Sequence, residues 1–248
     1  MKLSHKLCGA ALVAAAGLAL ALPNATKAAD PDSFNGDGHI AFTSDTSGAP
    51  TITDPGSSDG SVITDPSIVN PGDFGMIFVT PLEFGNHGVT GLGSTTKWNA
   101  ELYAANKGNA DEFDVQNFVS FQDFRESNNH AYTLKAEITT PFQTAATGGA
   151  ELTGATITYK NLWLNNNGGA AELNPSVEGD QVLASTGGSA TFINNTDTTG
   201  VGYGQFDLSF GTASDASGAS SVELFIPTTT AKKGDYKAVI TWTLQSVQ

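Results

Sequence analysis

The chain has 248 residues, of which only 15% are charged and 28 are glycine. Globular domains usually carry about 25% charged residues, so this composition excludes a long-helix or coiled-coil protein, and the length suits one domain or slightly more. A formal net charge of −14 would repel the phosphate backbone of nucleic acid, which is therefore not an expected partner.

Residues 1–28 have the pattern of a secretory signal peptide. A short basic region precedes an apolar run from Leu7 to Leu22, and small residues follow this run up to Ala28. The apolar run is shorter than the roughly 20 residues that span a membrane, so we expect cleavage rather than an uncleaved anchor. The only cysteine, Cys8, lies in this segment, so the exported chain would have no disulfide and no thiolate metal site. This absence favours a bacterial surface protein.

Residues 29–44 form an N-terminal segment in which residues 39–43 are predicted to be the first strand. In residues 45–71 the composition then changes to Ser, Gly, Asp and Pro, and Thr51-Ile52-Thr53-Asp54-Pro55 is echoed by Val62-Ile63-Thr64-Asp65-Pro66. Each Asp-Pro step disfavours helix. We predict an extended, acidic, poorly packed linker or loop, and no calcium site, because the full ligand pattern of a calcium loop is missing.

Residues 72–248 are a series of short strand signals separated by turn-forming clusters, which predicts one β domain. In most of these segments apolar and polar residues alternate, as in strands that bury one face. The predicted strands are 75–79, 118–121, 132–138, 155–159, 205–210, 221–226 and 236–244, and the Gly-rich breaks 146–149, 167–169 and 186–188 mark turns between strands. One short helix is predicted, over residues 99–105.

Two segments show the alternation over their whole length. Tyr236, Ala238, Ile240, Trp242 and Leu244 fall on one face of the last strand, and Tyr132, Leu134, Ala136 and Ile138 fall on one face of an earlier strand. Two sheets of such strands, packed face to face, form a sandwich. The predicted fold class is therefore all-β, an antiparallel β-sandwich, immunoglobulin-like or related, with long Gly/Asp/Pro-rich loops.

Several motifs, taken in their order, resemble the WxL-domain surface proteins of Gram-positive bacteria. They are Leu82-Glu83-Phe84-Gly85-Asn86-His87, Asp123-Phe124-Arg125, Tyr132-Thr133-Leu134, Thr140-Pro141-Phe142, Leu152-Thr153-Gly154-Ala155, Val222–Pro227 and Tyr236–Leu244. Together they extend over nearly all of the chain after the predicted signal peptide. The sequence departs from the family pattern in its first W-x-L motif, where Tyr132 stands in place of Trp, and in lacking a proline after the second motif, Trp242-Thr243-Leu244.

The resemblance implies a secreted protein that is bound non-covalently to the peptidoglycan of a Gram-positive cell wall, often beside other surface proteins. The residues themselves show no internal membrane span, lipidation cysteine or sortase-type tail, so we expect retention at the extracellular face of the wall by binding, without a cofactor. The alternative is an adhesion or surface-complex subunit. Such a subunit would bind host matrix or neighbouring surface proteins, for instance by strand addition at a sheet edge.

Four side chains are candidate ligand contacts, and each has a structural alternative. Trp98 and Trp163 lie beside predicted loops and next to asparagines, where an indole ring either stacks on a sugar or packs half-buried. Tyr132 and Leu134 either line a ligand site or belong to the core, since tyrosine tolerates a half-exposed position and offers a hydroxyl.

The motif residues of the last strand are predicted to serve a structural role. Tyr236, Trp242 and Leu244 share the apolar face of that strand, which favours burial in the core over contact with a ligand. Asp123 and Arg125 are two residues apart and would share a strand face, so we predict an ion pair between them rather than a ligand contact.

No catalytic or metal-binding motif is recognised in the sequence. His39, His87 and His130 have no matching serine or cysteine elbow, and the metalloprotease motif H-E-x-x-H is missing. We therefore expect a binding protein and not an enzyme, with no catalytic residues and no metal ligands.

Overall fold

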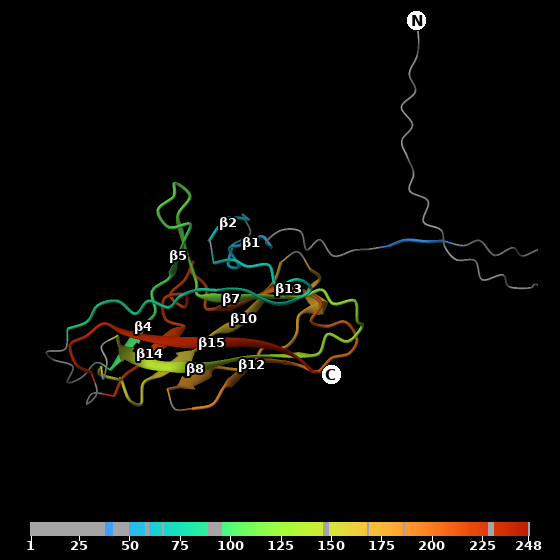
Figure 1. Cartoon of the computed structure of the whole chain (residues 1–248). Helices are drawn as coiled ribbons and strands as arrows, with labels where there is room; N and C mark the ends of the chain where they lie inside the picture. Colours follow the sequence, from blue (N-terminus) through green and yellow to red (C-terminus); the bar gives the residue numbers. More distant parts are fainter. Residues whose placement is uncertain are drawn as a thin grey trace, which may run out of the picture. The chain divides into compact units, whose positions relative to one another are not determined.

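The computed structural model describes residues 38–41, 50–57, 60–65, 67–88, 96–145, 149–167, 169–185, 187–227 and 231–247 (Figure 1). The chain divides into two units, residues 1–42 and residues 43–248, and the described strands all lie in the second unit. The predicted signal peptide falls outside the described residues. Of the first predicted strand, residues 39–41 are not in a strand, and residues 42 and 43 are not described.

The second unit is built from antiparallel strands. They are β1 (Ile52–Thr53), β2 (Val62–Ile63), β3 (Phe74–Val79), β4 (Lys97–Asn99), β5 (Tyr103–Ala105), β6 (Phe113–Val115), β7 (Phe118–Asp123), β8 (Tyr132–Thr144), β9 (Thr156–Tyr159), β10 (Leu162–Asn166), β11 (Gln181–Ala184), β12 (Ala190–Asn195), β13 (Gly204–Phe210), β14 (Val222–Phe225) and β15 (Tyr236–Ser246). One short 3-10 helix, Ala171–Leu173, is the only helical element in the described ranges. None of these ranges holds a helix long and apolar enough to cross a membrane.

Three sheets enclose the main core. They are the β7 sheet, in the order β10-β13-β7-β3, the β9 sheet, in the order β11-β9-β14-β4, and the β8 sheet, in the order β12-β8-β15. Each sheet contributes one apolar face, and the buried side chains from all three meet in one cluster, with Phe121, Phe206, Phe210, Ile157, Tyr159, Leu183, Tyr132, Leu134 and Phe192 among its members. Strand alternation therefore gives the packed antiparallel sheets of a β-sandwich, as the sequence predicted.

A second, smaller core covers the outer face of the β7 sheet. Ile52 of β1 and Ile63 of β2 are cross-strand partners, and both are buried beside Ile77 and Phe118. The expectation that residues 45–71 pack poorly is thus wrong for Ile52 and Ile63. The repeated Thr-Ile/Val-Ile segments are the two arms of a hairpin, which folds onto the sheet because both faces of β7 carry apolar side chains that need cover.

The predicted helix over residues 99–105 is also wrong. The structure forms β4 up to Asn99 and β5 from Tyr103, and Tyr103 and Ala105, two residues apart, are both buried in the smaller core. Between the two strands the Glu101 amide donates to the Glu83 carbonyl at 2.7 Å, which replaces the hydrogen bond that a helix would supply. Tertiary contacts have overridden the helix propensity of this alanine-rich segment.

The remaining predicted strands coincide with β3, β7, β8, β9, β13, β14 and β15. Strands β8 and β15 lie side by side along their length (Figure 1). Their register places Leu134 opposite Leu244 and Trp242 opposite Ala136. The two W-x-L-like motifs, which are more than a hundred residues apart in the sequence, are therefore neighbours in one sheet.

Candidate functional site

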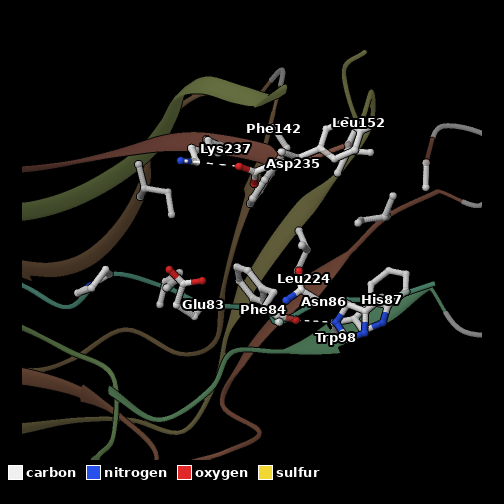
Figure 2. Close-up of a pocket in the computed structure, with 18 of the residues that line it drawn as sticks. Glu83, Phe84, Asn86, His87, Trp98, Phe142, Leu152, Leu224, Asp235 and Lys237 are labelled. Atoms are coloured by element: carbon white, nitrogen blue, oxygen red, sulfur yellow. Dashed lines mark hydrogen bonds and ion pairs between the residues drawn. The ribbon is translucent and has the colours of Figure 1, made fainter. Parts of the chain in front are cut away.

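A cavity of about 1150 Å³ opens between β15 and the segment that follows β3. One wall is the motif segment 80–88, and the other is formed by residues 231–242. Figure 2 shows Glu83, Phe84 and Asn86 on one side of this cavity and Asp235 and Lys237 on the other, with Trp98 and His87 together at one end. We call this cavity the β15 groove.

The motif segment is fixed at its beginning by Thr80. The Thr80 amide and hydroxyl both donate to the Phe118 carbonyl at 3.1 Å, and the Thr80 hydroxyl oxygen accepts from the Phe118 amide at 3.1 Å. Further along, the hydrogen bond between Glu101 and Glu83 ties the segment to the connection between β4 and β5. The first wall of the groove therefore rests on central strand β7 and is not a free loop.

His87 and Trp98 form an aromatic pair at one end of the groove. The chain turns back at Gly85, whose φ of +75° is a conformation that favours glycine, and the His87 Nε2–H donates to the Phe84 carbonyl at 2.5 Å. This contact holds the His87 ring against the Trp98 ring, with centroids 5.1 Å apart and planes inclined by 34°. Trp98 is half-buried, so its indole is one surface of the groove.

The second wall is the inner face of β15. Tyr236, Ala238, Ile240 and Trp242 all line the groove. The Trp242 indole also packs on the main core, with ring centroids 4.6 Å from Phe192 and 5.8 Å from Tyr159. These side chains are half-buried rather than buried because β15 is the edge strand of its sheet and the groove leaves part of each side chain uncovered.

The prediction that Tyr236, Trp242 and Leu244 are core describes only part of their contacts. All three pack against the main core, yet all three are half-buried, and Tyr236 and Trp242 also line the groove. The sequence pattern identifies the inner face of β15 correctly, but it does not show that part of this face is left open.

Tyr132 and Leu134 are fully buried in the main core, so of the two alternatives predicted for them the structure has the core position. Strand β8 is the central strand of its sheet, between β12 and β15, and its inner face packs on side chains of the other two sheets in the main core. The Tyr132 ring packs on Phe121, with centroids 5.8 Å apart. Its hydroxyl has no hydrogen-bond partner among the described residues, and burial raises the pKa of Tyr132.

Trp163 lies on β10, at the edge of the β7 sheet, and is not among the described residues that line the groove. It is half-buried, and its Nε1–H donates to the Gly211 carbonyl at 2.7 Å, which satisfies the only polar group of the indole. Of the four candidate ligand contacts predicted from the sequence, only Trp98 lies in the groove.

Asp123 and Arg125 form the predicted ion pair. Arg125 donates from Nε to Asp123 Oδ1 at 2.9 Å and from Nη2 to Asp123 Oδ2 at 2.7 Å, and its guanidinium lies 4.3 Å from the centroid of the Phe74 ring. The hydrogen bonds to Asp123 raise the pKa of Arg125. Because Arg125 also donates to the Ser246 hydroxyl, the pair fastens the end of β15 to the end of β7.

Asp207 is a buried carboxyl on β13, an inner strand of the β7 sheet, away from the groove. Burial raises its pKa to about 6, although the hydrogen bond from Asn167 stabilises the charged form. The Asn167 amide donates to Asp207 Oδ2 at 2.6 Å, and the Thr53 hydroxyl of the hairpin donates to Asn167 Oδ1 at 3.4 Å. The acid is thus a structural group beneath the β1–β2 hairpin.

The groove carries charge of both signs. Lys232, Lys233 and Lys237 line the wall formed by residues 231–242, with Asp235 among them and Glu83 on the opposite wall. In the described ranges of the chain, no three His, Cys, Asp or Glu side chains are close enough together to hold a metal ion. The arrangement suits a ligand that offers flat apolar faces, hydrogen-bonding groups and charge.

Sequence reasoning missed His87 and the three lysines as site residues. The motif Leu82–His87 was recognised only as a family resemblance, and nothing in its spacing shows that it meets residues 232–242, which follow about 150 positions later. The lysines did carry a signal, because three of them within six residues stand out in so acidic a chain.

Comparison with known proteins gives one match. Residues 29–247 match the model of a protein family described as the WxL domain, surface cell wall-binding. The comparisons with curated proteins and with solved structures returned no match. The matched range includes both walls of the groove.

Proposed function

Because the match covers residues 29–247, the chain belongs to the WxL family of cell-surface proteins that bind the cell wall, and we propose that its ligand in the wall is peptidoglycan, held in the β15 groove. Both walls of the groove come from segments that resemble family motifs, Leu82–His87 and Tyr236–Leu244. This coincidence between the motifs and the groove is the observation that carries the proposal.

The side chains of the groove suit a glycan. The rings of Trp98, His87, Tyr236 and Trp242 offer flat apolar surfaces on which a sugar ring can stack, and Asn86 and Glu83 offer hydrogen-bonding groups between them. A strand of peptidoglycan is long, and a cavity of about 1150 Å³ holds a few sugar units of it. The remaining affinity would come from contacts along the open edge of the groove.

The test is sedimentation of the purified protein with protein-free sacculi, comparing Trp98→Ala with Trp163→Ala. Both tryptophans are half-buried on edge strands, but only Trp98 lines the groove. We expect Trp98→Ala to weaken binding about tenfold or more, since aromatic anchors in binding sites often contribute about 1.5 to 3 kcal/mol. Trp163→Ala should bind like the unmodified protein if both variants melt at similar temperatures.

Two results would contradict this assignment. Failure of the unmodified protein to sediment with sacculi at micromolar concentration would rule out peptidoglycan as the ligand. Equal losses of binding in Trp98→Ala and Trp163→Ala, with the folds intact, would place the site outside the groove.

The proposal includes export of the chain and binding without cleavage. Support for export comes from the pattern of residues 1–28. Support for binding comes from the match to a family described as cell wall-binding. Incubation of sacculi with the protein should release no soluble muropeptides.

A second candidate function is the binding of a protein partner by strand addition. In the described part of the chain β15 pairs with β8 only, so one side of this 11-residue strand carries backbone groups outside the sheet ladder. A charged side chain at an exposed edge position, as in Val239→Lys, disfavours an added strand and leaves the backbone pairing with β8 in place. Loss of a protein partner but retention of sacculus binding in Val239→Lys would favour this second function.

A further inference from the structure

Basic residues are concentrated at one place in this acidic protein. Residues 43–248 contain eight lysines and arginines, and three of them, Lys232, Lys233 and Lys237, fall within six consecutive positions. All three line the β15 groove. We call residues 231–237, which lead into β15, the lysine turn.

Three of the other five cations in residues 43–248, Lys97, Lys160 and Arg125, have acidic partners, whereas Lys107 and Lys135 make no ion pair within the described ranges and do not line the groove. Lys97 and Lys160 both contact Glu223, at 2.7 Å and 3.2 Å, and these contacts lower the pKa of that carboxyl. Arg125 is held by Asp123. These basic groups are already neutralised within the fold, so they have little charge to offer a ligand.

The lysine turn differs in this respect. Neither Lys232 nor Lys233 makes an ion pair within the described ranges, and both side chains are exposed. Lys237 lies 3.8 Å from Asp235, but both side chains are more than 80% exposed, so this pair is weak. The acids that line the groove, Asp235 and Glu83, leave it with an excess of positive charge.

The backbone of the lysine turn is fixed by Tyr236. The Tyr236 hydroxyl donates to the Lys232 carbonyl at 3.0 Å and accepts from the Lys232 amide at 3.2 Å. A single ring that lines the groove therefore also holds the turn that carries the lysines. The cations and the aromatic surface are positioned together, as a site for one ligand requires.

We propose that the lysine turn is an anion subsite of the groove, which binds a carboxylate or phosphodiester group of the wall polymer through Lys232 and Lys233 while an adjoining sugar stacks on the aromatic surface. The inference rests on the proposed function and adds the charge of the ligand. With a formal charge of −14 the chain as a whole repels an anionic polymer, so close approach requires a local region of opposite sign.

The test compares two double variants that remove the same charge. Lys232→Gln with Lys233→Gln empties the subsite, whereas Lys107→Gln with Lys135→Gln removes two lysines that are not among the described groove residues. We expect the first pair to bind sacculi about tenfold more weakly, because two charge-assisted contacts are lost, and the second pair to bind within about twofold of the unmodified protein. Thermal melts should show that both variants remain folded.

Two pairs of probes distinguish the sources of the anion. Soluble muropeptides with free or amidated stem carboxyls test the carboxylate, and sacculi before and after removal of phosphate polymers by hydrofluoric acid test the phosphodiester. The anion that binds the lysine turn is the group whose amidation or removal weakens binding of the unmodified protein as much as the Lys232→Gln and Lys233→Gln substitutions do.

The outcomes separate this inference from the proposed function. If the unmodified protein binds sacculi but the two double variants bind equally well, the anion subsite is wrong and peptidoglycan binding stands. If neither pair of probes changes binding, the subsite is likewise wrong. If the unmodified protein does not bind sacculi at all, the proposed function itself fails.

Discussion

Strands β8 and β15 are neighbours in one sheet and carry the same alternation of apolar and polar residues, yet they differ in burial. Tyr132 and Leu134 of β8 are fully buried, whereas Trp242 and Leu244 of β15 are half-buried. Strand β8 has a partner on each side, and β15 is an edge strand whose inner face meets the groove. Position in the sheet, and not the motif itself, decides which of the two serves the core.

This difference reverses the roles that the residues suggested. The tyrosine, whose hydroxyl made it a candidate for ligand contact, is the structural member of the pair, and the tryptophan is the one that reaches the groove. Gly202, with φ of +99°, shows how closely Tyr132 is enclosed, because a Cβ atom there would lie 2.9 Å from the Tyr132 ring. The edge of the Tyr132 ring that faces Gly202 therefore has no free space beside it.

The largest expected effect on stability is at Tyr132, the buried motif residue of β8. Tyr132→Ala should lower the free energy of unfolding by about 3 to 5 kcal/mol, because it empties a large buried site. Tyr132→Phe should change it by less than about 1 kcal/mol, since the hydroxyl that is removed has no partner. Chemical denaturation of both variants measures the two values, and a large loss in Tyr132→Phe would show that the hydroxyl is hydrogen-bonded after all.

The second prediction concerns Asp207, the buried acid beneath the β1–β2 hairpin. The folded pKa of Asp207 is about 6, above the ordinary value of 3.8, because burial disfavours the charged form. Its protonated form therefore favours folding below about pH 4, and this contribution is lost as the pH rises towards 6. The loss amounts to about 3 kcal/mol at neutral pH.

Asp207→Asn isolates that contribution, because it keeps the shape of the side chain and removes the titration. Denaturation between pH 4 and pH 7 should show the unmodified protein losing about 2.5 kcal/mol relative to the variant, since part of the effect is already lost at pH 4. Parallel stability curves for the two proteins would mean that water reaches Asp207 and that the hairpin covers the sheet less completely than Ile52 and Ile63 indicate.

The smallest expected effect on stability is at Trp242, the half-buried motif residue of β15. Trp242→Ala should cost about 2 kcal/mol, less than a fully buried aromatic residue, because part of the indole already faces the groove. Its effect on binding should be the larger one, with sacculus binding weakened about tenfold at a temperature where the variant is folded. A variant as unstable as Tyr132→Ala, or one that binds normally when folded, would remove the distinction between the two strands.

Much of the fold was predictable from local pattern. Alternation placed β8 and β15 and identified their inner faces, and it placed most of the core strands, because a strand with one buried face needs apolar residues at every second position. The alternation of apolar and polar residues did not predict strands in segments that are short or rich in turn-forming residues. Residues 51–53 and 62–63 are each too short to show alternation, and only contact with the β7 sheet makes them strands.

The site was less predictable than the fold. Trp98 was identified from its position beside a loop, but His87, Tyr236 and the lysine turn become a site only when segments about 150 residues apart are brought together. Tyr132 and Trp163 were both candidate ligand contacts in the sequence. Their exclusion depends on neighbours in space, namely the strands on both sides of β8 and the Gly211 carbonyl beside the Trp163 indole.

The sequence by itself determined the all-β architecture, the family and the acidic charge, since each follows from composition, period or the order of motifs along the chain. Only the tertiary structure decided which strand is central and which is at the edge, which face of the β7 sheet is covered, and where the groove opens. The physical reason is that alternation records which side chains need burial, while the extent of burial depends on strand order and on packing between segments distant in sequence.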